Sequence, residues 1–93
     1  STLTFDKPDI ETFRGLALAY KAIEIGGSMP AVYNGANEEA VAAFLGGNCS
    51  FLGIAELVEK AMDNHKTVIN PDLESIIDSD RQARIFVRNL LNK

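Results

Sequence analysis

Apolar residues recur at the spacing of one α-helical face in the second half of the chain. They occupy positions i, i+3, i+4, i+7 and i+8 of one segment, namely Ile54, Leu57, Val58, Ala61 and Met62. This spacing places all five side chains on one side of a helix. No strand-like alternation of apolar and polar residues occurs beyond residue 5. The sequence therefore predicts an all-α fold, a small bundle of four principal helices with short loops and an extended N-terminal lead-in.

Glycine pairs and apolar spacing divide the chain into segments. We expect residues 1–12 to form the lead-in and residues 13–93 the helical domain. The first helix is predicted over residues 13–25, where an apolar stripe has helical spacing: Phe13, Leu16, Ala17, Tyr20 and Ile23. The pairs Gly26-Gly27 and Gly46-Gly47 are predicted to end the first and second helices, because glycine readily adopts the left-handed conformation found at helix C-termini.

The second helix has more than one candidate start. It is predicted to begin near Pro30 or to restart at Asn34 or Asn37, since proline suits a first turn and asparagine is a competent N-cap. Glu38 and Glu39 would then lie in a first turn, where negative charge suits the positive end of the helix dipole.

The last helical region also has two candidate starts. Asn70 is predicted to be an N-cap, followed by Pro71 at the first helical position. Ser79 and Gln82 have the spacing of a capping box, which predicts a restart of the helix there. The final helix should run nearly to Lys93.

Charge and composition exclude several classes of partner. The chain has 93 residues, 13 of them acidic and 9 basic, for a net charge of −4. This balance lacks the positive patch that phosphate backbones and anionic membranes attract. No apolar run approaches the ~18 residues of a membrane span, and one cysteine cannot form an internal disulfide. We expect a cytoplasmic protein with no nucleic-acid or membrane partner.

The usual catalytic and metal-binding combinations are missing from the sequence. His65 is the only histidine, and its polar surroundings favour a surface or C-cap role over catalysis. Cys49 has no base beside it in the sequence. Acidic pairs such as Glu38-Glu39 are better explained by helix starts than by a metal site. We expect no catalytic residue, no cofactor-binding residue and no metal ligand in this chain.

Five polar residues are arranged more specifically than folding alone requires. Asn34, Asn37 and Glu38 share one helix face if the helix already includes Asn34, and Asp80 and Arg84 have i, i+4 spacing. One interpretation makes these residues helix caps and an exposed ion pair. The other makes them contacts with another domain, satisfying its backbone groups. Both interpretations remain open from the residues alone.

A weaker motif suggests a different class of protein. Residues 25–29, Ile-Gly-Gly-Ser-Met, partly match the Leu-Gly-Gly-x-Ser-Leu prosthetic-group site of acidic helical carrier proteins. In that alternative Ser28 would carry a phosphopantetheine arm. One residue is missing before the serine, however, and Pro30 follows where a helix should be under way. A free-standing carrier or adaptor module is therefore the alternative function.

A family resemblance covers essentially the whole chain. Residues 30–45, Pro-Ala-Val-Tyr-Asn-Gly-Ala-Asn-Glu-Glu-Ala-Val-Ala-Ala-Phe-Leu, closely resemble the Pro-Ala-x-Leu-Asn-Ala-Ala-Asn-Glu-x-Ala-Val-x-x-Phe-Leu signature of 1-deoxy-D-xylulose 5-phosphate reductoisomerase, in its C-terminal helical domain. Residues 3–9, 16–22, 51–54 and 80–84 resemble the linker and the helix starts of that domain in the right order. Tyr33 and Gly35 depart from the usual Leu and Ala.

The resemblance implies an oxidoreductase of the non-mevalonate isoprenoid pathway in bacteria. The complete enzyme rearranges 1-deoxy-D-xylulose 5-phosphate and reduces the product with NADPH, assisted by Mg²⁺ or Mn²⁺, to 2-C-methyl-D-erythritol 4-phosphate. In that family the catalytic, nucleotide-binding and metal-binding groups all precede this segment. The chain is then the C-terminal domain, which packs against the catalytic domain of the same polypeptide in a homodimeric enzyme. Alone it should be inactive and should self-associate weakly through a face that its partner normally covers.

Overall fold

The computed structural model describes residues 10–93, which form four α-helices without strands. The helices are α1 (Ile10–Ile25), α2 (Met29–Leu45), α3 (Phe51–Asn64) and α4 (Leu73–Leu91). The all-α prediction is therefore confirmed. Helix α1 begins at Ile10 rather than near residue 13, so the last residues of the predicted lead-in are helical. The rest of that lead-in, residues 1–9, lies outside the described residues.

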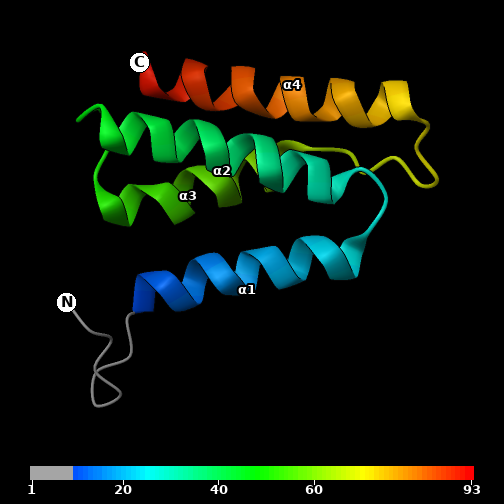
Figure 1. Cartoon of the computed structure of the whole chain (residues 1–93), viewed down its shortest axis with the longest axis horizontal. Helices are drawn as coiled ribbons and strands as arrows, with labels where there is room; N and C mark the ends of the chain where they lie inside the picture. The colour runs from blue at the N-terminus through cyan, green and yellow to red at the C-terminus, as the bar shows by residue number, and fades with distance from the viewer. Residues whose placement is uncertain (1–9) are drawn as a thin grey trace.

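The helices are arranged around a central pair (Figure 1). Helices α2 and α3 pack against each other in the middle, with α1 on one side of the pair and α4 on the other. Helix α4 runs along α2, and α1 contacts both α2 and α3. Within residues 10–93, α1 and α4 do not contact each other. Each outer helix therefore has one face toward the central pair and another directed away from the bundle.

The core is built mainly from small aliphatic side chains. Val32, Val58 and Val87 are its largest fully buried members, one from each of α2, α3 and α4. Alanines fill most of the remaining core positions, which lets neighbouring helix axes approach closely. Among the side chains of α1 that the structure describes, residues 13–25, two are buried, Leu18 and Ala22. The core is therefore centred on α2 and is thinnest beneath α1.

Helix α2 is continuous, which corrects the predicted restarts within it. Asn34 and Asn37 lie inside the helix, so neither is an N-cap, and Glu38 and Glu39 lie beyond the first turn. Ser28 occupies the N-cap position, and Pro30 lies in the first turn as predicted. The helix continues through this polar segment because Val32, Ala36 and Ala40 bury its opposite side in the core.

The start of α4 also differs from the prediction. Asp72 is the N-cap, and its side chain accepts a hydrogen bond from the Ser75 amide at 2.8 Å. Asn70 instead lies in the preceding turn with a positive φ of 56°. Ser79 is buried in the middle of the uninterrupted helix, so the predicted restart is wrong. Its burial against the core outweighs the local capping preference of serine.

The α1–α2 turn and the α3–α4 connection set the positions of the outer helices. Gly26 and Gly27 have φ values of 74° and 56° and reverse the chain between α1 and α2. A Cβ at Gly27 would collide with the carbonyl of Val68. The glycine therefore allows the α1–α2 turn to lie directly against the α3–α4 connection.

None of the helices in residues 10–93 has the length and apolarity needed to cross a bilayer.

Candidate functional site

Polar side chains of α2 and α4 bind one another across the helix interface. Arg84 donates from Nε to Asp80 Oδ1 and from Nη2 to Glu38 Oε1, both at 2.6 Å. Asn34 donates from Nδ2 to the second oxygen of Asp80 at 3.1 Å. The α2–α4 polar cluster, defined as Asn34, Glu38, Asp80 and Arg84, thus contains four of the five candidates for caps or interdomain contacts. It joins segments that are 46 residues apart in the sequence.

A second ion pair continues this interface toward the C-terminus. Arg88 donates from Nε and Nη2 to the two oxygens of Glu39, at 2.7 and 3.2 Å. Hydrogen bonding to Asp80 and then to Glu38 raises the pKa of Arg84, and hydrogen bonding to Glu39 raises the pKa of Arg88. Both guanidinium groups therefore remain charged at any physiological pH, and the three carboxylates that bind them have a fixed positive partner.

Gly35 allows the backbones of α2 and α4 to approach at this cluster. A Cβ at Gly35 would lie 2.6 Å from the Asp80 carbonyl oxygen and 2.9 Å from Asp80 Oδ1. Real Cβ atoms do not tolerate such distances from a backbone atom. The close approach places Asp80 within reach of both Asn34 and Arg84. Gly35 is therefore part of the geometry of the cluster, a role that depends on how α2 and α4 pack and has no local signal in the sequence.

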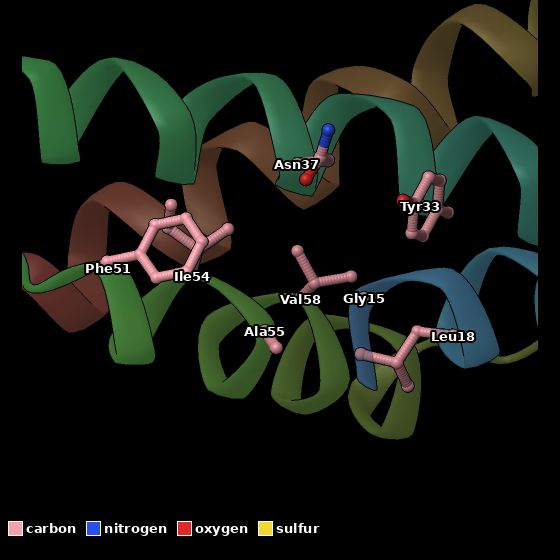
Figure 2. A pocket seen from close by; sticks show the side chains of 8 residues that line it. All are labelled: Gly15, Leu18, Tyr33, Asn37, Phe51, Ile54, Ala55 and Val58. Carbon is pink, nitrogen blue, oxygen red and sulfur yellow. The ribbon is translucent and has the colours of Figure 1, made fainter. Parts of the chain in front are cut away.

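Asn37 is separated from the cluster and lines a small cavity between α1, α2 and α3 (Figure 2). The cavity holds about 60 Å³, and most of its lining is apolar, including Leu18, Ile54 and Val58. Asn37 and Tyr33 reach toward it from α2. Among the hydrogen bonds of residues 10–93, none uses the Asn37 side chain. The cavity is too small for a substrate. The Asn37 amide is therefore available only to a group that enters the cavity from outside.

Ser28 has a structural role that excludes the carrier interpretation. Its side chain is completely buried, accepts a hydrogen bond from the Val68 amide at 2.8 Å and shares another with His65 Nε2 at 2.7 Å. A serine that carries a prosthetic group must be accessible to a modifying enzyme. The Ser28 hydroxyl is buried and is already hydrogen-bonded to two groups. The sequence carries no local signal for the pairing with His65, because the two residues are 37 positions apart.

His65 lies at the C-terminal end of α3, in agreement with the predicted C-cap role. It is the C-cap residue, and its backbone amide bonds the Met62 carbonyl. Partial burial lowers the pKa of its imidazole, because desolvation disfavours the charged form. Burial likewise raises the pKa of the Cys49 thiol, whose Sγ donates to the Ser50 carbonyl at 3.2 Å. A protonated thiol of this kind is a poor nucleophile.

The described side chains do not form a metal site. No group of three or more His, Cys, Asp or Glu residues converges in residues 10–93. These features define a small all-α domain in which interhelical ion pairs and buried hydrogen bonds connect the helices. Its polar groups are arranged to hold helices together.

Comparison with known proteins identifies the family. Residues 1–86 match the family model described as the DXP reductoisomerase C-terminal domain, and the chain belongs to this family. The 1-deoxy-D-xylulose 5-phosphate reductoisomerase of Listeria monocytogenes is 50% identical over 98% of the chain. That of Ruminiclostridium cellulolyticum is 54% identical over 96% of the chain. The chain spans only 24% and 23% of these two relatives.

A solved structure supports the same assignment. The 1-deoxy-D-xylulose 5-phosphate reductoisomerase from Zymomonas mobilis, in complex with NADPH, superposes with a TM-score of 0.80 at 40% identity. The superposition covers 98% of this chain and 26% of that one. The resemblance inferred from residues 30–45 is thereby confirmed. The chain matches one domain of a larger enzyme.

Proposed function

We propose that this chain is the non-catalytic C-terminal domain of an NADPH-dependent reductoisomerase. The enzyme would convert 1-deoxy-D-xylulose 5-phosphate to 2-C-methyl-D-erythritol 4-phosphate in the bacterial cytoplasm, as a step of non-mevalonate isoprenoid biosynthesis. The observation that carries this proposal is identity of 50% or more to named reductoisomerases over nearly the entire chain. The domain would comprise residues 13–93, with residues 1–12 as the linker that leads into it.

The chemistry would reside in the part of the enzyme outside this chain. The acidic residues of the α2–α4 polar cluster are engaged by Arg84, which supports a role in packing rather than in binding Mg²⁺ or Mn²⁺. The described residues do not fit a divalent cation, because no three candidate ligands converge. The metal and NADPH would therefore be held by the catalytic part of the same polypeptide, and the full-length enzyme would be a homodimer.

The five polar residues predicted as interdomain contacts remain candidates for that role. Glu38 is exposed on α2 and could accept a further hydrogen bond while Arg84 binds it. Asn37 has a half-buried amide that a backbone group of another domain could satisfy. Asn34, Asp80 and Arg84 would act mainly by holding Glu38 in place. In the absence of the catalytic domain, exposed apolar residues would cause the isolated chain to self-associate weakly.

Enzyme assays on three proteins test the proposal. The full-length polypeptide, the isolated chain and a truncation lacking residues 13–93 are each given 1-deoxy-D-xylulose 5-phosphate, NADPH and Mg²⁺ or Mn²⁺. Oxidation of NADPH is followed by absorbance. We expect turnover by the full-length protein alone. Turnover by the isolated chain would overturn the non-catalytic role, and a full-length protein without activity on this substrate would overturn the assigned reaction.

A scattering measurement tests the predicted self-association. The apparent mass of the isolated chain should rise with concentration above that of a 10.1 kDa monomer. A mass that stays monomeric at high concentration would contradict an uncovered docking face.

A further inference from the structure

Helix α1 is apolar on two opposite sides. Leu18 and Ala22 are buried against α2 and α3. At 100° per residue, a second stripe made of Phe13, Leu16, Tyr20 and Ile23 lies on the other side of the helix. All four of these side chains are exposed, Tyr20 at 65% and Ile23 at 67%. This set is called the outer α1 stripe below.

The outer α1 stripe faces away from the rest of the bundle. Helix α1 lies at one edge of the bundle formed by residues 10–93, and its neighbours α2 and α3 both lie on its inner side (Figure 1). The four residues follow one another at intervals of three or four, so the stripe extends over about 15 Å of helix. A soluble domain rarely leaves a continuous apolar surface of this kind uncovered.

Other exposed apolar residues form less continuous surfaces. On α4, Leu73, Ile76 and Ile77 are exposed near the helix start, but Asp80 and Arg84 continue the same side of the helix, so its apolar part ends after Ile77. At the α2–α3 connection, Phe44 and Phe51 pack edge to face with ring centroids 5.7 Å apart and cover part of each other. Among the described side chains, the outer α1 stripe is therefore the longest uninterrupted stripe of exposed apolar residues on a single helix.

We propose that the outer α1 stripe is the surface on which the preceding part of the same polypeptide docks. This inference rests on the proposed function and specifies its interface. About three quarters of each relative lies outside the region that this chain matches, and the matching family model is a C-terminal domain. In those relatives the part outside the match therefore lies before the segment that corresponds to α1. A tethered partner meets the first helix at high effective concentration, so a modest apolar face is sufficient for stable docking.

Cysteine labelling in the full-length enzyme tests whether the stripe is covered. Ile23→Cys and Ile77→Cys are compared, because these isoleucines have similar exposure in the isolated domain, 67% and 59%. Alkylation at each site is read by peptide mass spectrometry, which separates it from Cys49, and each rate is divided by its rate in denaturant. We expect labelling at residue 23 to be slowed more than tenfold and labelling at residue 77 to be nearly unaffected. Equal protection at both sites, or faster labelling at residue 23, would overturn the assignment.

A crosslink identifies what covers the stripe. A benzophenone amino acid replaces Tyr20 in the full-length enzyme, and the captured peptide is sequenced after irradiation. Capture of a peptide that precedes residue 1 within the same polypeptide is the expected result. Capture of residues 1–9, capture of a second copy of the enzyme, or absence of any crosslink would overturn the proposed occupant. Neither experiment depends on turnover, so failure here is distinguishable from failure of the assigned reaction in the activity assay.

Discussion

Helix α4 and helix α1 occupy equivalent positions on opposite sides of the α2–α3 pair, but they meet their neighbours in opposite ways. The contact of α4 with α2 is polar at its margin, with Arg84 and Arg88 bound to three carboxylates over a closely packed backbone at Gly35. Helix α1 has no buried residue other than Leu18 and Ala22 among its described side chains, and its longest apolar stripe is exposed.

The contrast shows that apolar content alone does not reveal which face of a helix is buried within a domain. The more polar helix is fixed by specific pairs that are complete inside this chain. The more apolar helix has a face for which this chain supplies no cover in residues 10–93. A completed interface and an uncovered one should respond differently to substitution, to salt and to the presence of the rest of the enzyme.

The largest difference is expected between two leucines of α1. Leu18 is 6% exposed and Leu16 is 49% exposed. Leu18→Ala should lower the free energy of unfolding by about 2–5 kcal/mol, because it leaves a cavity in the core. Leu16→Ala should have little effect on the dilute isolated chain. Urea unfolding followed by circular dichroism measures both. Similar losses for the two variants would show that the outer α1 stripe is already covered.

Two glycines in helix interiors should give changes of opposite sign. Gly35→Ala places a methyl group against the Asp80 backbone, and such overpacking costs about 1–3 kcal/mol, partly offset by the better helix propensity of alanine, about 1 kcal/mol. Gly15→Ala meets no atom within 4 Å, so propensity should stabilise α1 by about 0.5–1 kcal/mol. Thermal unfolding of the pair checks the signs. Stabilisation by Gly35→Ala would show that α2 and α4 separate without cost.

Sequence patterns predicted where the helices lie better than they predicted which apolar faces are buried. The apolar spacing of residues 54–62 correctly indicated α3, because its periodicity reflects a face that this chain buries, with Val58 fully enclosed. The same reasoning found α1 through Phe13, Leu16 and Tyr20, yet those residues are exposed. Periodicity reports that a face is apolar. It does not report whether the covering partner belongs to the same domain.

The capping predictions within α2 and α4 were wrong, and the contacts between helices were not predicted, because partners distant in the sequence decided both. Asn34 was a reasonable N-cap by local rules, but its amide binds Asp80, which is 46 residues away. The i, i+4 pairing of Asp80 with Arg84 was predictable, whereas the third member, Glu38, required knowledge of the helix packing. Ser28 with His65 had no local signal at all. The resemblance in residues 30–45 correctly indicated the family, but it predicted neither the contact with Glu38 nor that between Ser28 and His65.

The ion pairs of the α2–α4 interface should be weak and sensitive to salt. Arg84→Gln removes the partner of both Asp80 and Glu38, and partly exposed pairs of this kind contribute about 1 kcal/mol or less each. Arg81→Gln is the matched control, because Arg81 pairs only with Asp78 within α4. The free energy of unfolding should fall more for Arg84→Gln than for Arg81→Gln. The loss for Arg84→Gln should shrink as the NaCl concentration is raised, because mobile ions screen surface charges. Equal losses at both positions would contradict a structural role for the cluster.

The smallest expected effect is a pH dependence of the free energy of unfolding. It arises from His65, which is hydrogen-bonded to Ser28 beside the α1–α2 turn. Partial burial lowers the pKa of His65 below its ordinary 6.5, so the unfolded chain binds a proton more readily than the folded one. The stability associated with neutral His65 is therefore complete above about pH 6.5. It is lost as the pH falls from there through the lower folded pKa.

The variant His65→Gln isolates this contribution. The difference in unfolding free energy between the wild-type chain and the variant should grow in favour of the wild type as the pH rises from acidic values to about 6.5. Asp72 does not interfere in that range, because hydrogen bonding to Ser75 lowers its pKa below the usual 3.8. Hydrogen exchange should show the loss at the Val68 amide, which donates to Ser28, and not along α2 and α4. A uniform loss of protection across all four helices would show that this turn and the α2–α4 interface unfold as one unit.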